Sequence, residues 1–180
     1  TTWMVQHAAI GNAKEIYLNN DSAAGNSTAW NSTSPTTTVF SVTGGAGDGV
    51  NHSGDYIGFC FAEVKGFSKF GSYVGNGNAD GTFVYTGFKP AWVLARSTAA
   101  SKNWIMYDNK RLGYNVSNSY LYANESNNES DSTHIIDLVS NGFKCRANSS
   151  DTNTSGNTYI YMAFAESPFV TSTGIPNNAR

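Results

Sequence analysis

The chain has 180 residues, a formal net charge of −2 and only 13% charged residues, while 39% of its residues are hydrophobic. The apolar content suffices for one large or two small domains, and the lack of a basic stripe argues against a nucleic-acid partner. No apolar run approaches the roughly 20 residues that span a bilayer, so membrane insertion is not expected. The abundance of Asn, Ser, Thr and Gly is typical of secreted, surface and virion β-proteins.

Short strands are predicted along the whole chain, because apolar residues alternate with polar or small ones and no segment has the period of a helix. Clusters of Gly, Asn and Ser separate these runs. In chain order, strands are expected at Trp3–His7, Lys14–Asn19, Thr37–Thr43, Tyr56–Glu63, Thr82–Thr86, Trp92–Arg96, Asn103–Asp108, Ser119–Ala123, His134–Val139, Gly142–Arg146 and Tyr159–Glu166. Many short strands joined by such turns predict an all-β fold, a β-sandwich or jelly roll.

One motif occurs twice in the chain. The stretch Asn51–Glu63 returns near the other end as Asn153–Glu166, and the pentapeptide at Trp3 has a counterpart at Trp104. Equivalent landmarks stay roughly 100 residues apart over more than half of each copy, which chance similarity would not maintain. The sequence therefore predicts two related repeats.

The first repeat is expected to be incomplete. In the second copy a strand-like stretch, residues 87–96, precedes Trp104, whereas only two residues precede Trp3. We therefore expect the chain to be the C-terminal part of a longer protein. The predicted division is residues 1–70 for the rest of the first repeat and 71–180 for the second repeat with its C-terminal tail.

The two cysteines do not indicate a disulfide framework, because two thiols are too few to staple a chain of this length. Cys60 aligns with Ala163 of the other copy, which favours a small buried residue over a redox or metal role. Trp3 and Trp104 recur at equivalent strand positions and are interpreted as core anchors.

Several longer motifs support a family resemblance: Trp-x-Val-x-His, Tyr-Leu-Asn-Asn, Lys-Phe-Gly-Ser-Tyr-x-Gly-Asn-Gly, Val-Tyr-Thr-Gly-Phe-Lys-Pro-Ala and Tyr-Ile-Tyr-Met-Ala-Phe-Ala-Glu. Together they resemble a repeat domain of unknown function at the C-terminal ends of structural proteins of marine tailed bacteriophages, described as concanavalin A-like. The resemblance implies a lectin-like sandwich in a tail fibre, tailspike or head fibre. It also implies a homotrimer with other virion proteins as partners. It supplies no catalytic or binding residues.

No catalytic site is expected. Glycosidases on such sandwiches place two carboxylates about 5 Å apart, typically from a Glu-x-Asp-x-x-Glu string, and none occurs here. Glu63 and Glu166 each end the same strand in their own copies, so we expect them either to cap the strand end or to pair with a nearby lysine. A Gly-x-Ser-x-Gly turn is also absent, and the three histidines, His7, His52 and His134, lack metal-ligand spacing. We therefore expect no enzyme, cofactor or metal.

Glycan binding requires an aromatic face beside amide or carboxylate groups, and two predicted loops offer that chemistry. The candidate residues are Tyr73, Asn76, Asn78 and Asp80 in one loop, and Tyr107, Asp108, Asn109 and Tyr114 in the other. Oxygens of the first loop would also suit calcium, although the alternating pattern of a calcium loop is lacking. Because Tyr and Asn are abundant throughout, ordinary solvated turns remain the alternative.

Three functions remain open at this point. The first is recognition of a host-surface glycan by a virion protein, with weak single sites strengthened by several copies on one particle. The second is a ligand-free decoration module that stabilises a capsid or tail by packing. The third is a polysaccharide depolymerase, which the missing carboxylate string disfavours.

Overall fold

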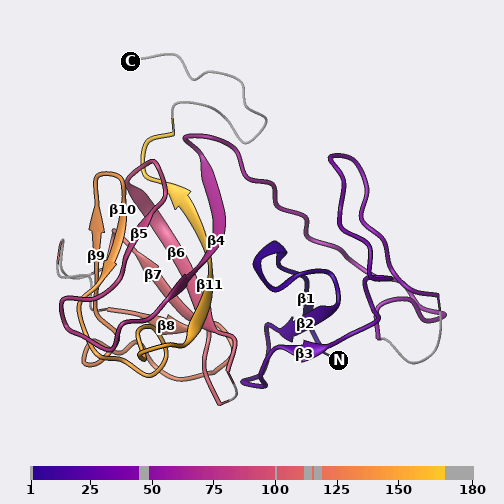
Figure 1. Ribbon diagram of the computed structural model, residues 1–180, viewed down its shortest axis with the longest axis horizontal. Coiled ribbons are helices and arrows are strands. Elements are labelled where there is room, and N and C mark those ends of the chain that lie inside the picture. The colour runs from indigo at the N-terminus through magenta and orange to yellow at the C-terminus, as the bar shows by residue number, and fades with distance from the viewer. Residues whose placement is uncertain (1, 45–48, 100, 112–114, 116–118, 169–180) are drawn as a thin grey trace.

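The computed structural model describes residues 2–44, 49–99, 101–111, 115 and 119–168. Over these residues the chain is all-β apart from one turn of 3₁₀ helix (Figure 1). The elements are β1 Met4–Val5, η1 Ala8–Ile10, β2 Lys14–Tyr17, β3 Gly25–Asn26, β4 Ser68–Val74, β5 Phe83–Tyr85, β6 Pro90–Ser97, β7 Ile105–Asp108, β8 Leu121–Tyr122, β9 Ile136–Val139, β10 Gly142–Cys145 and β11 Thr158–Ala165. No helix in the described residues is long and apolar enough to cross a membrane.

The strands form three antiparallel sheets in three layers. A five-stranded sheet with the order β4-β11-β6-β7-β8 lies in the middle. The sheet β5-β10-β9 covers one of its faces, and the small sheet β1-β2-β3 lies on the other side (Figure 1). The two larger sheets enclose the main core and give the molecule a sandwich-like, all-β architecture.

Strand β11 shows how alternation builds these layers. Tyr159, Tyr161 and Ala163 point into the main core, whereas Ile160 and Met162 point to the opposite face. Both faces are apolar, as expected for a central strand covered on two sides. The strand is paired along almost its whole length with β4 on one edge and β6 on the other.

The main core is rich in tyrosine, and each buried hydroxyl needs a partner. The Tyr73 hydroxyl donates to the Thr152 carbonyl at 2.9 Å, and the Tyr107 hydroxyl donates to the His134 carbonyl at 2.9 Å. Because the ring packs in the core while the hydroxyl reaches a loop carbonyl, these tyrosines tie the sheets to the loops at their ends.

The N-terminal segment covers the outer face of the five-stranded sheet. Ile16 of β2 is fully buried there against Leu94 and Ile160. Arg96, also fully buried, donates to the backbone carbonyls of Tyr17 and Ser22. A second set of bonds joins the same parts of the chain: Trp104 Nε1 to the Tyr17 carbonyl at 2.7 Å, and the Ala24 amide to the Thr98 carbonyl at 2.9 Å.

Most of the predicted strands are confirmed, β6 being longer than predicted and most others shorter, whereas two predicted strands are wrong. The segments 37–43 and 56–63 form no strand, and the structure adds β3 and β4, which were not predicted. The boundary predicted at residue 70 falls inside β4, so the strands of the sandwich begin before it.

The failure at 56–63 has a physical cause. Its counterpart β11 has a hydrogen-bonded neighbour on each edge, whereas 56–63 has no strand partner among the described residues. Alternating apolar side chains therefore have no sheet to pack on, and Ile57 is 85% exposed. For the same reason Cys60 is exposed, contrary to the expectation of burial, and Trp3 is 54% exposed, so it is not a core anchor. Trp104, by contrast, is buried as expected.

Arg96 provides a test of how the N-terminal segment is held. In an Arg96→Met variant the apolar volume is kept, but the Tyr17 and Ser22 carbonyls lose a charged donor. We expect the free energy that protects the Ala24 amide from hydrogen exchange to fall by about 1.5–3 kcal/mol. Amides of β10, away from this contact, should keep their protection. Arg111→Met, at a partly exposed ion-paired site, is the control; equal protection of Ala24 in both variants would contradict the anchor role.

Candidate functional site

The two loops predicted to bind a glycan do not present their aromatic residues. Tyr73 is 7% exposed and Tyr107 is 1% exposed, and both rings belong to the main core. This corrects the prediction for both residues, because a buried ring offers no face to a sugar. Tyr114 lies outside the described residues.

The polar groups of the first loop are mostly engaged in holding the loop itself. Asn76 Oδ1 accepts from the Asn78 amide at 3.0 Å, and Asn78 Oδ1 accepts from the Asp80 amide at 2.9 Å. The Asp80 carboxylate is paired with Lys144 and Arg146, and the Lys144 ammonium lowers the pKa of Asp80. Among the described residues, no group of three or more His, Cys, Asp or Glu side chains is placed to hold a metal ion.

Asn153 organises this loop and was not anticipated from the sequence. The side chain is fully buried and donates to Asn76 Oδ1 at 3.1 Å, to the Asn78 carbonyl at 2.8 Å and to the Ala147 carbonyl at 3.0 Å. Asn153 Oδ1 accepts from the Asn76 amide at 3.0 Å. The loop is therefore a rigid structural turn.

Replacing Asn153 tests this assignment. In Asn153→Ala the partners in the loop and at Ala147 lose their bonds inside a site closed to water. We expect the free energy of unfolding in urea to fall by about 2–3 kcal/mol. Asn148→Ala, at an exposed position in the same segment, should change it by less than about 0.5 kcal/mol. Equal effects would mean that the bonds to Asn153 contribute little.

The second loop is also held by its own polar groups. Asp108 Oδ1 accepts from the Lys110 and Arg111 amides, and Arg111 Nε lies 2.5 Å from Asp108 Oδ2. The Asn109 amide group donates to Glu166 Oε1 at 2.7 Å. Both Asp108 and Asn109 thus have structural partners instead of open polar groups.

Both recurring glutamates pair with lysines, which is one of the two structural roles expected from the sequence. Glu63 Oε1 lies 2.8 Å from Lys69 Nζ, and Glu166 Oε2 lies 2.5 Å from Lys89 Nζ. The Lys89 ammonium is the main reason that the pKa of Glu166 is lowered. A carboxylate stabilised as the anion in this way is poorly suited to act as a general acid.

Ser149, His134 and Asp151 come together at one end of the sandwich, a constellation that no sequence motif revealed. Ser149 Oγ bonds to His134 Nδ1, and Asp151 Oδ2 lies 3.5 Å from His134 Nε2. The Tyr122 hydroxyl also reaches Nε2, at 3.2 Å. All three members are less than a tenth exposed, so the Ser149 hydroxyl is not presented to a substrate. His134 is therefore more deeply buried than the surface or half-buried position expected for the three histidines.

One buried histidine, His134, and one half-buried histidine, His7, predict a loss of stability in mild acid. Burial lowers the pKa of His134, which the Asp151 charge partly opposes and the Lys102 charge reinforces, and burial likewise lowers the pKa of His7. Below the ordinary value of 6.5 the unfolded chain therefore binds more protons than the folded chain.

The free energy of unfolding should accordingly fall as the pH drops from 7.5 to 5.5, by up to about 1.4 kcal/mol per pH unit for each histidine. Urea unfolding at three pH values measures this slope. His134→Asn should reduce the slope, and His52→Asn, at an exposed position, serves as the control. A slope that survives the removal of both His134 and His7 would exclude these side chains as its cause.

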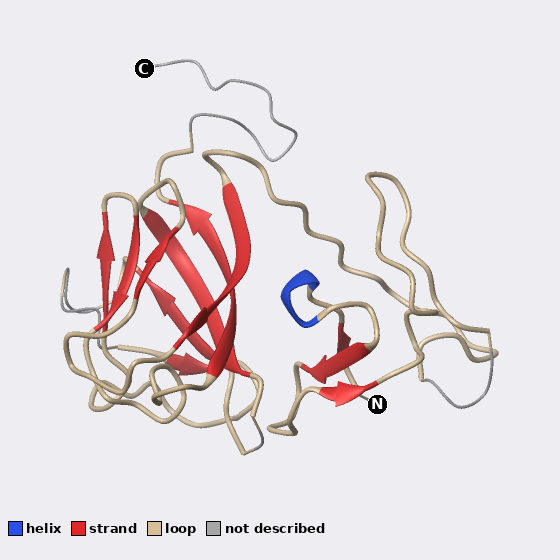
Figure 2. Cartoon of the chain, in the orientation of Figure 1, coloured by secondary structure: helices blue, strands red, loops and turns tan. Residues whose placement is uncertain are grey.

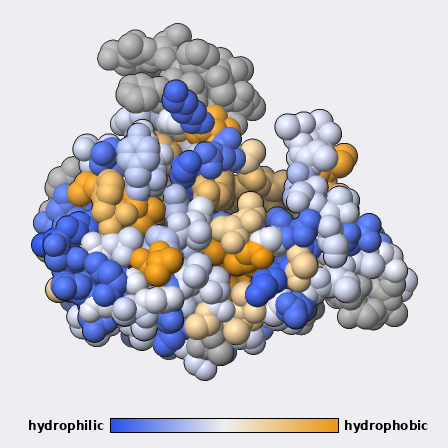
Figure 3. All heavy atoms as spheres, in the orientation of Figure 1, coloured by the Kyte–Doolittle hydropathy of each residue, from blue (hydrophilic) through white to orange (hydrophobic). Residues whose placement is uncertain are grey.

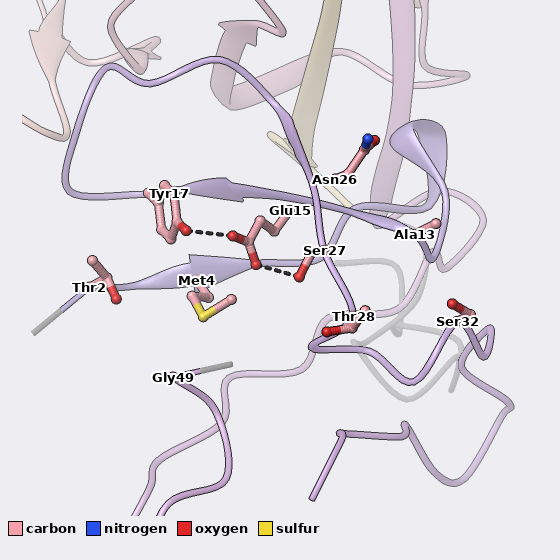
Figure 4. Close-up of a pocket in the computed structure, with 10 residues that line it drawn as sticks. All are labelled: Thr2, Met4, Ala13, Glu15, Tyr17, Asn26, Ser27, Thr28, Ser32 and Gly49. Atoms are coloured by element: carbon pink, nitrogen blue, oxygen red, sulfur yellow. Dashed lines mark hydrogen bonds between the residues drawn. The ribbon is translucent and has the colours of Figure 1, made fainter. Parts of the chain in front are cut away.

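A hollow of about 640 Å³ lies against the small sheet, on the side away from the sandwich. Figure 4 shows the Glu15 carboxylate between the hydroxyls of Tyr17 and Ser27, both of which donate to it. The Glu15 hydrogen bond is the main reason that the pKa of Tyr17 is raised, to about 12. The carboxylate already accepts from these two hydroxyls, and the described lining holds no Lys, Arg, His or Cys side chain.

The open face of the sheet β5-β10-β9 carries the most suitable groups for binding. Its six outward residues come from the alternation of the three strands: Phe83, Tyr85, Gly142, Lys144, Asp137 and Val139. Phe83 is 45% exposed and Tyr85 is 63% exposed. The space-filling view shows hydrophobic side chains gathered over β5 and β10, next to hydrophilic ones (Figure 3).

Polar groups lie across the same face. Lys144 stands between Phe83 and Asp137 in the strand register, and Arg146 Nε lies 3.2 Å from Asp137 Oδ2. The other oxygen, Asp137 Oδ1, is buried and has no hydrogen-bond partner in the described structure. Gly142 has no room for a side chain, because a Cβ there would lie 2.0 Å from the Val84 carbonyl oxygen and 3.1 Å from the Phe83 ring. The sequence analysis did not single out this aromatic pair, although the alternation in the predicted strand 82–86 places Phe83 and Tyr85 on one face.

This architecture defines an all-β, sandwich-like protein in which the outward face of β5-β10-β9 combines exposed aromatic and charged groups. The chain matches the family model described as a domain of unknown function, DUF7483, over residues 1–168. It therefore belongs to the DUF7483 family. No curated protein and no solved structure matches the chain.

Proposed function

We propose that the chain is a lectin-like module of a phage virion protein that binds a glycan of the host surface through the open face of β5-β10-β9. The face offers Phe83 and Tyr85 side by side on one edge strand, with Asp137 and Arg146 across the sheet. An exposed aromatic pair on a rigid strand provides contact area at little entropic cost, because few side-chain rotations are frozen on binding.

The chemistry of the face suits a sugar ring better than a purely apolar ligand. The C–H surface of a pyranose packs on an aromatic ring, while its hydroxyls both donate and accept hydrogen bonds. Asp137 Oδ1 is an acceptor without a partner, and Arg146 and Lys144 supply donors. Because Asp137 Oδ1 is itself buried, the part-exposed Lys144 and Arg146 side chains are the polar groups of this face that a sugar hydroxyl meets first.

The proposed setting follows from the resemblance to phage structural proteins. A concanavalin A-like module in a trimeric tail or head fibre would present several such faces to one cell. Weak binding at each face would then become strong attachment, because linked sites raise the effective concentration without new contacts. The proposed location is the virion, with other virion proteins as neighbours.

A decoration module without a ligand is the second candidate, and one observation favours it. Tyr56, Ile57, Phe59 and Phe61 are all more than half exposed, which suits packing against another protein component. Depolymerase activity is the third candidate. The paired states of Glu63 and Glu166 give it no support.

Substitution of Tyr85 tests the proposed glycan face. We expect Tyr85→Ala to weaken adsorption to host cells or binding on a glycan array roughly tenfold or more, the loss expected for a central aromatic contact. Tyr56→Ala removes a comparably exposed tyrosine from a different surface and should leave binding unchanged. Phe83→Ala should act in the same direction as Tyr85→Ala.

The alternatives give different results in the same experiments. Binding that free sugar does not compete away, or that survives both Tyr85→Ala and Phe83→Ala, would reject the proposed face. No binding to any host polysaccharide would favour the decoration module. Release of new reducing ends from host polysaccharide would indicate the depolymerase.

A further inference from the structure

Two unpaired stretches of backbone lie close together beside the small sheet. β1 is an edge strand, because its sheet has the order β1-β2-β3. The segment 56–63 runs as an extended loop between the small sheet and β4 and has no strand partner in the described part of the chain (Figure 2). The Trp3 and Phe59 rings stack with their centroids 6.4 Å apart, so the two stretches are neighbours.

The hairpin β1–β2 has the same construction as the hairpin β7–β8. Met4 pairs with Tyr17 in the first, as Ile105 pairs with Tyr122 in the second. The same hydrogen bond closes the end of each hairpin. In the first, the Trp3 amide donates to Asn19 Oδ1 at 2.9 Å, and in the second the Trp104 amide donates to Asn124 Oδ1 at 2.8 Å. Likewise, the Leu18 amide donates to the Trp3 carbonyl at 2.8 Å and the Ala123 amide to the Trp104 carbonyl at 2.9 Å.

The sequence of 56–63 resembles that of β11, and β1 resembles β7. The sandwich therefore shows how stretches like β1 and 56–63 pair with a neighbouring strand. There, β6 lies between β7 and β11 and forms antiparallel ladders with both. Leu94 of β6 stands opposite Met106 on one side and Met162 on the other. Around the small sheet the equivalents of β7 and β11 are present, and the strand between them is missing from the described residues.

We infer that β1 and the segment 56–63 form a docking site for one antiparallel β-strand of the β6 type. Such a strand has about eight residues, bears apolar side chains on both faces and pairs with β1 on one edge and with 56–63 on the other. The ladders of β6 set its register. The residue in the Leu94 position lies between Val5 and Phe59, and the residue in the Val93 position lies opposite Cys60.

A free strand fits this site better than a second copy of the chain. In each copy β6 is already held on both edges by β7 and β11, so it is not available to a neighbour. An inserted strand would also cover Ile57 and Phe59, which are 85% and 69% exposed, and would satisfy two unpaired edges at once. Addition of a strand to an exposed sheet edge is an established mode of peptide recognition.

The test uses the full chain and a synthetic peptide with the sequence of residues 88–98. Hydrogen exchange monitored by mass spectrometry should show exchange slowed roughly tenfold or more at β1 and at residues 56–62 when the peptide is added. A peptide of the same sequence with alternate backbone amides methylated cannot form both ladders and should give no protection.

Two variants of the chain distinguish strand pairing from nonspecific hydrophobic binding of the peptide. Phe59→Pro removes a ladder donor from the segment and should abolish the protection. Val39→Pro changes an equally exposed apolar residue outside the site and should leave it intact. Unchanged melting of both variants confirms that the sandwich is still folded, since both positions are exposed.

Disulfide formation with Cys60 tests the proposed register of the inserted strand, independently of the affinity of the peptide. In the presence of oxidised glutathione, which accepts the two electrons, a peptide with cysteine at the Val93 position should form a disulfide with Cys60. A peptide with cysteine at the Leu94 position should form far less, because that side chain points to the other face of the strand.

Three outcomes would overturn the inference. They are no protection at any peptide concentration, protection that appears at β7 and β11 because the peptide exchanges with β6, and concentration-dependent self-association that protects 56–62 without peptide. The inference does not rest on the glycan proposal, since none of its residues belongs to the face of β5-β10-β9. Failure of either leaves the other intact.

Discussion

The five-stranded sheet must be covered on both faces, and the rest of the structure follows from that constraint. Its central strand β11 carries apolar side chains on each side, so a single covering sheet would leave half of them in water. The sheet β5-β10-β9 covers one face and the N-terminal segment covers the other. The Arg96 and Trp104 side chains donate hydrogen bonds to the Tyr17 carbonyl of the covering segment and so fix its position on the sheet. The N-terminal segment is therefore part of the fold of the sandwich.

Two similar stretches of sequence take different conformations in this chain, which indicates that strand formation depends on the neighbouring strands. Thr158–Ala165 lies between two strands and is regular, whereas 56–63 has nearly the same alternation but no partner and remains extended without a ladder. Phe61 still contacts the rings of Phe70 and Phe164, so the end of the segment is held near the sheet. Local propensity brings the chain to the extended state, and pairing alone completes the strand.

Sequence alternation predicted the strands of the sandwich because each buries at least one regular face. β4 was missed because Lys69, Gly71 and Ser72 make it look like a turn, although β11 pairs with it over seven residues. The predicted glycan site failed for a related reason. A tyrosine whose hydroxyl reaches a loop carbonyl, such as Tyr73, can occupy the core, and sequence gives no sign of which carbonyl it meets.

The polar side chains that sequence singled out act mainly within the fold. Asn153, Asp108 and Glu166 each bond to backbone or side-chain groups of nearby segments. Their amide and carboxylate groups therefore stabilise the fold.

These internal hydrogen bonds determine which surfaces are available for ligand binding. A loop whose donors and acceptors are already paired must break a bond to bind a ligand, and that cost offsets the gain from the new contact. The outward residues of a strand carry no such obligation, because the ladder satisfies the backbone and leaves the side chains free. Phe83 and Tyr85 on β5 meet this condition, which is why the open sheet face is a better binding surface here than the polar loops.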